Sequence, residues 1–134
     1  MKNLLVLLLG VILITMVTPE VKAQRWPFGA ANRVSLTLTN DTVVISTELK
    51  RGLNYYSYST DTATVIQATN LSSELKTGDF VFFEISNTGG DNETVGFSTG
   101  LTGAAVTLVA AKTHIIGFVY NGTALKKYLS TQVN

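Results

Sequence analysis

The stretch Val34-Ser-Leu-Thr-Leu-Thr39, Asn40-Asp41, Thr42-Val-Val-Ile-Ser-Thr47 carries the strongest fold signal in this chain of 134 residues. Apolar and small polar residues alternate on both sides of Asn40-Asp41, which is typical of strands with one buried face. Asn and Asp tolerate the positive φ that a two-residue hairpin turn demands. We therefore predict a hairpin whose apolar residues pair on one face beside Val34: Leu38 with Val43 and Leu36 with Ile45.

The rest of the chain repeats this pattern of short runs and turns. Branched and aromatic residues suit a pleated surface, and after residue 24 a helical apolar period is absent except for one short turn around 70–76. The two faces of 80–86 are both apolar, so this strand is predicted to be central. Asn121-Gly122 is the strongest two-residue hairpin signal. The further predicted strands are 54–59, 62–68, 80–86, 94–98, 105–109, 114–120 and 123–130.

These runs predict an all-β fold. We expect a single antiparallel β-sandwich or jelly-roll-like barrel of eight or nine short strands, preceded by an apolar N-terminal helix. The expected organisation is a signal peptide or apolar anchor helix at 1–23, a linker or docking arm at 24–32, and the β-sandwich domain at 33–134.

The first 23 residues have the composition of an export or membrane segment. A basic start at Met1-Lys2-Asn3 precedes an apolar run from Leu4 to Val17, and Val21-Lys-Ala23 fits a signal-peptidase site. The run is shorter than the roughly 20 apolar residues that a transmembrane helix needs. Two alternatives remain: cleavage that leaves Gln24 as the first residue, or retention as an anchor that contacts a membrane through residues 4–17.

Charge and cysteine content exclude several classes of protein. The formal net charge is +1, and no cluster of Lys and Arg suggests nucleic-acid binding. The chain has no cysteine, so an exported domain of this size must be stabilised by packing and backbone pairing rather than by disulfides.

Catalytic and metal-binding patterns are missing from the sequence. His114 is the only histidine, a Gly-X-Ser-X-Gly nucleophile motif does not occur, and one histidine without cysteine does not make the usual zinc set. The stretch Gly89-Gly-Asp-Asn-Glu93 has oxygen ligands that suit calcium, but a solvated turn explains it better. We therefore predict a protein that is not an enzyme and has no catalytic, cofactor or metal site.

Two groups of aromatic residues are candidate binding residues. Trp26, the only tryptophan, and Phe28 lie in a segment without alternation, so they either cap the core or form an arm that docks on a neighbouring subunit. Tyr55, Tyr56 and Tyr58 lie close together in 54–59 and form a candidate glycan-binding platform, although core packing explains them equally well.

The C-terminal part resembles a family of viral proteins. The stretch from Phe97-Ser-Thr-Gly100 through Ala111-Lys-Thr113 to the closing Tyr120-Asn-Gly-Thr-Ala124 resembles small β proteins of bacteriophage virions, found in decoration, spike and tail-associated domains. The resemblance implies a structural role without catalytic residues. The apolar leader departs from this pattern, but phages that contain a lipid membrane use small proteins with an apolar N-terminal helix to link shell and bilayer.

Two functions follow as hypotheses. The first is a non-enzymatic structural protein of a virion, as a capsid-associated decoration or spike component tethered to a membrane. The second is an exported bacterial surface protein, either a filament subunit or a glycan-binding adhesin. Under both, the expected location is the virion or the cell surface, and the expected partners are further copies of the chain or other virion or surface proteins. Few charges protect the edge strands, which favours pairing with neighbours.

Overall fold

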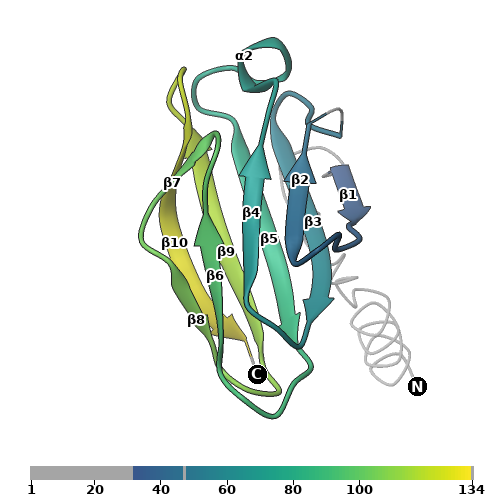
Figure 1. The fold of residues 1–134 in the computed structure, drawn as a ribbon. Coiled ribbons are helices and arrows are strands. Elements are labelled where there is room, and N and C mark those ends of the chain that lie inside the picture. The colour runs from purple at the N-terminus through teal and green to yellow at the C-terminus, as the bar shows by residue number, and fades with distance from the viewer. Residues whose placement is uncertain (1–31, 47, 134) are drawn as a thin grey trace, which may run out of the picture.

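The computed structural model describes residues 32–46 and 48–133. The predicted leader at 1–23 lies outside the described residues, and so does the predicted arm apart from Asn32. Trp26 and Phe28 therefore lie outside them as well. The described residues form two facing β-sheets and one short helix (Figure 1).

Ten strands make up the two sheets of the described part. Six belong to the larger sheet, in the order β1-β3-β5-β9-β10-β7, and four to the smaller one, in the order β2-β4-β6-β8. The bounds are β1 Asn32–Ser35, β2 Thr42–Ile45, β3 Leu53–Thr60, β4 Thr64–Ala68, β5 Phe80–Asn87, β6 Glu93–Phe97, β7 Leu101–Thr102, β8 Val106–Leu108, β9 Thr113–Tyr120 and β10 Leu125–Val133. The helix α2 spans Leu71–Glu74.

The first six strands form a coil rather than a sandwich. Successive strands alternate between the sheets, and within each sheet they pair in parallel: β1 with β3, β3 with β5, β2 with β4 and β4 with β6. This connectivity is that of a β-solenoid. The all-β prediction is confirmed, whereas the antiparallel sandwich or jelly-roll-like barrel is wrong, because each turn carries the chain to the opposite sheet.

The segment around Asn40-Asp41 shows how the pairing differs from the prediction. Both residues have the predicted positive φ, 49° and 56°, and the amide and carbonyl groups of Thr39 and Thr42 bond to each other. Beyond that bridge the two arms separate, one toward β3 and the other toward β4. The predicted pairs Leu38–Val43 and Leu36–Ile45 do not form, although these apolar side chains all pack against the core, as the alternation indicated.

The core is built from rows of side chains that run across the strands. In the larger sheet Tyr56, Phe83 and Ile116 share one row, and all three are fully buried. The rings of Tyr56 and Phe83 stack with centroids 5.6 Å apart, while Phe83 meets Phe118 edge to face at 5.8 Å. β5 lies between β3 and β9, so its predicted central position is confirmed.

Buried asparagines fix two corners of the coil. Asn54, at the start of β3, exchanges two hydrogen bonds with the backbone of Lys50, at 2.8 and 2.6 Å. Asn87, at the end of β5, accepts a bond from the amide of Gly89 and donates to the carbonyls of Asp91 and Leu108. Because buried backbone groups need partners, these amides stabilise turns that have no ladder of their own.

After β6 the direction of the chain reverses. β7 joins the far edge of the larger sheet, and β8 returns antiparallel to β6. Gly100 makes this possible: its φ is +81°, its carbonyl accepts from the amide of Leu125, and a Cβ there would lie 2.1 Å from the carbonyl oxygen of Ala68. Only glycine fits such a close approach of two backbones.

The chain ends in the antiparallel hairpin β9–β10, which confirms the predicted turn at Asn121-Gly122. The loop is longer than predicted: Tyr120 pairs with Leu125, and Asn121 Oδ1 accepts from the amides of Thr123 and Ala124. The register shifts at Tyr128, because Lys127 pairs with Phe118 and Leu129 with Gly117. This β-bulge lets Tyr128 lie on the outer face of the sheet beside Gly117.

Candidate functional site: the outer aromatic cluster

Four aromatic rings gather on the outer face of the six-stranded sheet. We call Tyr55, Phe80, Phe82 and Tyr128 the outer aromatic cluster. Tyr55 stacks on Phe82 and Phe82 on Phe80, each with centroids 6.4 Å apart. Tyr128 meets Phe80 and Phe82 edge to face, at 5.7 and 6.1 Å. These spacings are those of favourable aromatic pairs.

Strand register and one glycine bring the rings together. Tyr55 pairs with Phe82, and Phe82 with Gly117, so the three positions form one row across β3, β5 and β9. A Cβ at Gly117 would lie 3.0 Å from the rings of both Phe82 and Tyr128. The two rings from β5 and β10 therefore cover the glycine, and a side chain at this position would push them apart.

The cluster is more exposed than a core would be. Phe80 is 40% exposed and Tyr128 51%, and Leu129 beside them is 36% exposed. Glu84 lies on the same face and accepts a hydrogen bond from the hydroxyl of Tyr55. Partial burial raises the pKa of Tyr128, so its hydroxyl is neutral at physiological pH. Apart from the carboxylate of Glu84, the surface is thus apolar, which is the character of a protein-binding patch.

The predicted glycan platform is not formed as one surface. Tyr56 and Tyr58 point into the core, where they are 0% and 5% exposed, and only Tyr55 lies on the outer face. Burial raises the pKa of Tyr58 to about 12, against a hydrogen bond with Thr64 that lowers it. Burial, with a smaller effect of Glu48, also raises the pKa of Tyr56. The alternation along 54–59 therefore reflects core packing.

His114 has a structural position. It is 5% exposed, and its Nε2 accepts a hydrogen bond of 2.9 Å from the amide of Val109, in the turn between β8 and β9. Burial lowers its pKa, so the neutral form that accepts this bond is favoured. In the described part of the chain its Nε2 thus bonds to a backbone amide rather than to a carboxylate or hydroxyl.

The acidic and glycine-rich segments do not make a metal site in the described ranges. No group of three or more His, Asp or Glu side chains there could hold an ion. In the loop Gly89–Glu93, the carbonyl of Asp91 and the side chain of Asn92 bind Asn87 and the amide of Ala110 instead. The loop thus serves as a corner of the coil.

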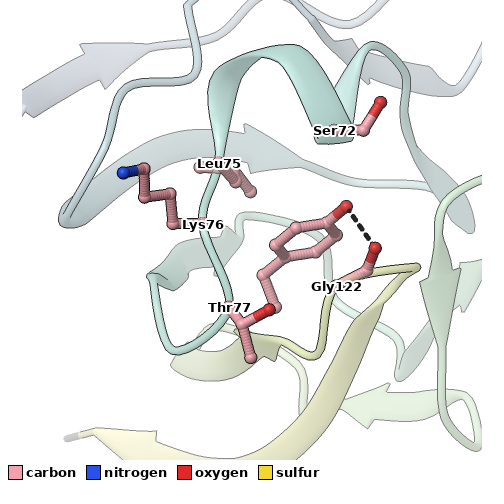
Figure 2. A pocket seen from close by; sticks show the side chains of 6 residues that line it. Ser72, Leu75, Lys76, Thr77 and Gly122 are labelled. Atoms are coloured by element: carbon pink, nitrogen blue, oxygen red, sulfur yellow. Dashed lines mark hydrogen bonds between the residues drawn. The ribbon is translucent and has the colours of Figure 1, made fainter.

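One depression lies beside α2 at the end of the β9–β10 hairpin, with a cavity volume of about 470 Å³ (Figure 2). Ser72, Leu75, Lys76, Thr77 and Gly122 line it, and the hydroxyl of Tyr120 donates to the carbonyl of Gly122. Lys76 is its one charged side chain. Such an open hollow, with a single charged side chain, lacks the converging groups of a small-molecule site.

No helix among the described residues is long and apolar enough to cross a membrane. The apolar run 4–17 lies outside those residues.

The sequence reasoning missed Phe80, Phe82 and Tyr128. The signal for the first two was present, since they alternate with the core residues of 80–86, but two apolar faces also fit a strand that is covered on both sides. Tyr128 was hidden by the bulge, which breaks the alternation of β10. Comparisons with protein-family models, curated proteins and solved structures give no match for this chain.

Proposed function

We propose that the protein is a non-enzymatic structural component of a virion that assembles through one end of its β-solenoid. The observation that carries this proposal is the pair of edge strands at that end. Among the described residues, the larger sheet ends on β1 and the smaller sheet ends on β2, so both sheets offer a backbone edge on the same side of the domain (Figure 1).

The backbone pattern of β2 supports strand addition there. The carbonyls of Asp41 and Ile45 accept from Val65 and Thr69, so the odd-numbered residues of β2 bond toward β4. In a parallel strand the intervening residues face the other side, which places the amide and carbonyl of Val44 on the open edge. An edge of this kind is a template for pairing with another chain.

Side chains at the same end also favour a partner. Val34, Leu36 and Leu38 pack against the core but are only partly buried, and Val44 is 51% exposed. A strand added to β1 or β2 would extend the sheets and cover these residues, with a gain of roughly 25 cal/mol for each Å² of apolar area removed from water.

Two features of the sequence favour a virion over the cell surface. The stretch from Phe97 to Ala124 resembles small β proteins of bacteriophage particles, and the apolar segment at 1–23 suits a link between a shell and a membrane. An adhesin is less favoured, because the rings of Tyr55, Phe82 and Phe80 stack on one another and so have less ring face available for a sugar.

The test is incorporation into particles made with Val44→Pro. Proline removes the edge amide without affecting the bonds to β4, so we expect the copy number per particle to fall about tenfold, equivalent to about 1.4 kcal/mol of binding. The matched control, Val44→Thr, removes a little apolar area but keeps the amide, so its copy number should fall far less than that of Val44→Pro.

Circular dichroism of both variants establishes that the domain is folded, and mass spectrometry of purified particles counts the copies. Normal incorporation of Val44→Pro would overturn assembly through this edge. Absence of the native protein from particles, together with its recovery from the surface of the producing cell, would overturn the virion assignment in favour of the exported surface protein. The intact mass then shows whether residues 1–23 remain attached.

A further inference from the structure

We propose that the second half of β10, residues 128–133, pairs antiparallel with the same strand of a second copy of the chain, about a two-fold axis at Ser130. This inference goes beyond the proposed function and does not rest on it, because that function concerns β1 and β2, at the other end of the sheets. The pairing joins the larger sheets of two copies edge to edge.

The second half of β10 is a sheet edge in the described part of the chain. β10 lies between β9 and β7, but β7 has only two residues and pairs with Leu125 and Lys126 alone. The pairing with β9 continues as far as Val133. Beyond Lys127, β10 therefore has a described neighbouring strand on one side only (Figure 1).

The backbone of Ser130 faces this edge. The even-numbered residues of β9 bond toward β5, as the amide of Tyr120 does in donating to the carbonyl of Asp79. The odd-numbered residues of β9 therefore bond toward β10, among them Ile115, which pairs with Thr131. Because directions alternate along a strand, Ser130 has its amide and carbonyl on the side away from β9.

The side chains of this half of β10 are apolar and uncharged. Three of the six exposed large apolar residues in the described part lie here, namely Tyr128, Leu129 and Val133. No residue from 128 to 133 is charged, although natural edge strands are usually protected by charges, lysine above all. The nearest lysine, Lys127, does not protect this part of the edge, because its ammonium group donates to the carbonyl of Ala104.

A second copy in antiparallel orientation fits this edge. When Ser130 lies opposite Ser130 of the second copy, their amides and carbonyls exchange two hydrogen bonds, and Leu129 lies opposite Thr131. The two Lys127 residues are then about six residue spacings apart, roughly 20 Å. Parallel pairing in register would put each Lys127 beside its copy, and like charges directly opposite are destabilising. The two-fold contact uses the same edge of both copies, so it closes a dimer.

Charge placed at the two-fold axis tests the contact. Ser130 is exposed on the last strand, so Ser130→Lys and Ser130→Asp should fold as the native chain does. A contact of one short strand predicts a dissociation constant on the order of 10 µM, and like charges opposite each other should raise it about tenfold in either variant. An equal mixture of the two variants pairs Lys with Asp and should recover the native dimer.

Sedimentation equilibrium of the full chain measures these constants, and circular dichroism establishes that each variant is folded. Ser130→Thr adds no charge and keeps the backbone amide, so this matched control should dimerise as the native chain does. Native protein that stays monomeric at about 1 mM would overturn the inference. Equal association of all variants would overturn it too, because another surface would then join the copies. So would a mixture that associates no better than its components.

A cysteine at the axis gives a second, independent measurement. The native chain has no cysteine, so Ser130→Cys can form a disulfide only between copies. Residues that exchange both hydrogen bonds in an antiparallel pair have Cα atoms about 5.5 Å apart, which suits a disulfide. Faster cross-linking than in Thr107→Cys, an exposed position on β8, supports the pairing, and equal rates would contradict it.

Discussion

The strands β1–β6 and the strands β7–β10 contribute to the same two sheets but pair with their neighbours differently. In the first region each connection crosses to the other sheet, and strands pair in parallel with partners far away in sequence. In the second region β7–β8 and β8–β9 also cross, but the chain reverses: β8 pairs antiparallel with β6, and β9 and β10 form a local antiparallel hairpin within one sheet. Both regions show similar alternation of apolar and polar residues. The difference teaches that the connections, rather than the strands, decide the topology.

The largest loss in the free energy of unfolding is expected from a substitution at Gly100, where the two regions join. Gly100→Ala places a Cβ against the carbonyl of Ala68 at positive φ, and we expect a loss of about 4 kcal/mol in the free energy of unfolding from strain and overpacking. Urea unfolding measures it.

The matched control for that variant is Gly52→Ala. Gly52 also has positive φ, +95°, but has open space around its Cβ position, so about 1 kcal/mol is expected. Equal losses in the two variants would show that backbone strain alone, and not the close approach to Ala68, makes glycine necessary at the reversal.

The turns of the two regions should contribute differently to the free energy of unfolding. Asn87→Ala removes three hydrogen bonds from a buried corner of the coil and should cost about 2 kcal/mol. Asn121→Ala removes two bonds from the exposed hairpin loop, where water replaces them, and should cost about 0.5 kcal/mol. Thermal unfolding of both variants tests this ranking, and a reversed order would contradict a coil that depends on its buried corners.

The contact between the regions should weaken in acid through His114, which pairs with Ile85 of the coil. Burial lowers the pKa of His114 in the folded state, so the unfolded chain takes up the proton first as the pH falls below about 6.5. Stability is therefore full above that pH and is lost below it. His114→Gln keeps an acceptor for Val109 but does not titrate, so its urea midpoint should fall less between about pH 7 and about pH 5. Parallel curves for the two proteins would exclude His114 as the cause.

The smallest change in the free energy of unfolding is expected from a substitution in the turn between β8 and β9. Ala111 has a positive φ of 56°, which is unfavourable for a side chain. Ala111→Gly should raise the free energy of unfolding by about 0.5 kcal/mol, because relief of strain exceeds the added entropy of the unfolded chain. A melting temperature below that of the native protein would show that the strain is absent.

Much of the secondary structure could be predicted from the sequence, because alternation and turn chemistry act locally. The strand at 80–86, the short helical turn near 70–76 and the turns at Asn40-Asp41 and Asn121-Gly122 all have local causes, and all are present. Topology could not be predicted in the same way. A turn of the kind found at Asn40-Asp41 usually closes a hairpin, and nothing local shows that its two arms belong to different sheets.

The repeat of the coil was hidden by its uneven length. Asn32 pairs with Asn54 and Asn54 with Val81, so the second step is longer than the first, largely because α2 is inserted before β5. A search for a fixed period misses a solenoid of this kind. The candidate site was missed for a related reason: Tyr128 joins Phe80 and Phe82 only through the bulge of β10 and the strand register.

The position of the β9–β10 hairpin has a consequence for the time course of folding. It is the most local pairing of two strands in the described part, and local pairings close quickly because little chain entropy is lost beforehand. β9 also pairs with β5, so the hairpin offers the coil its first template. Yet these residues are synthesised after every strand of the coil. The coil strands β1–β6 must therefore wait, unpaired, until the hairpin has been synthesised, and the domain acquires its structure only after β10 has emerged.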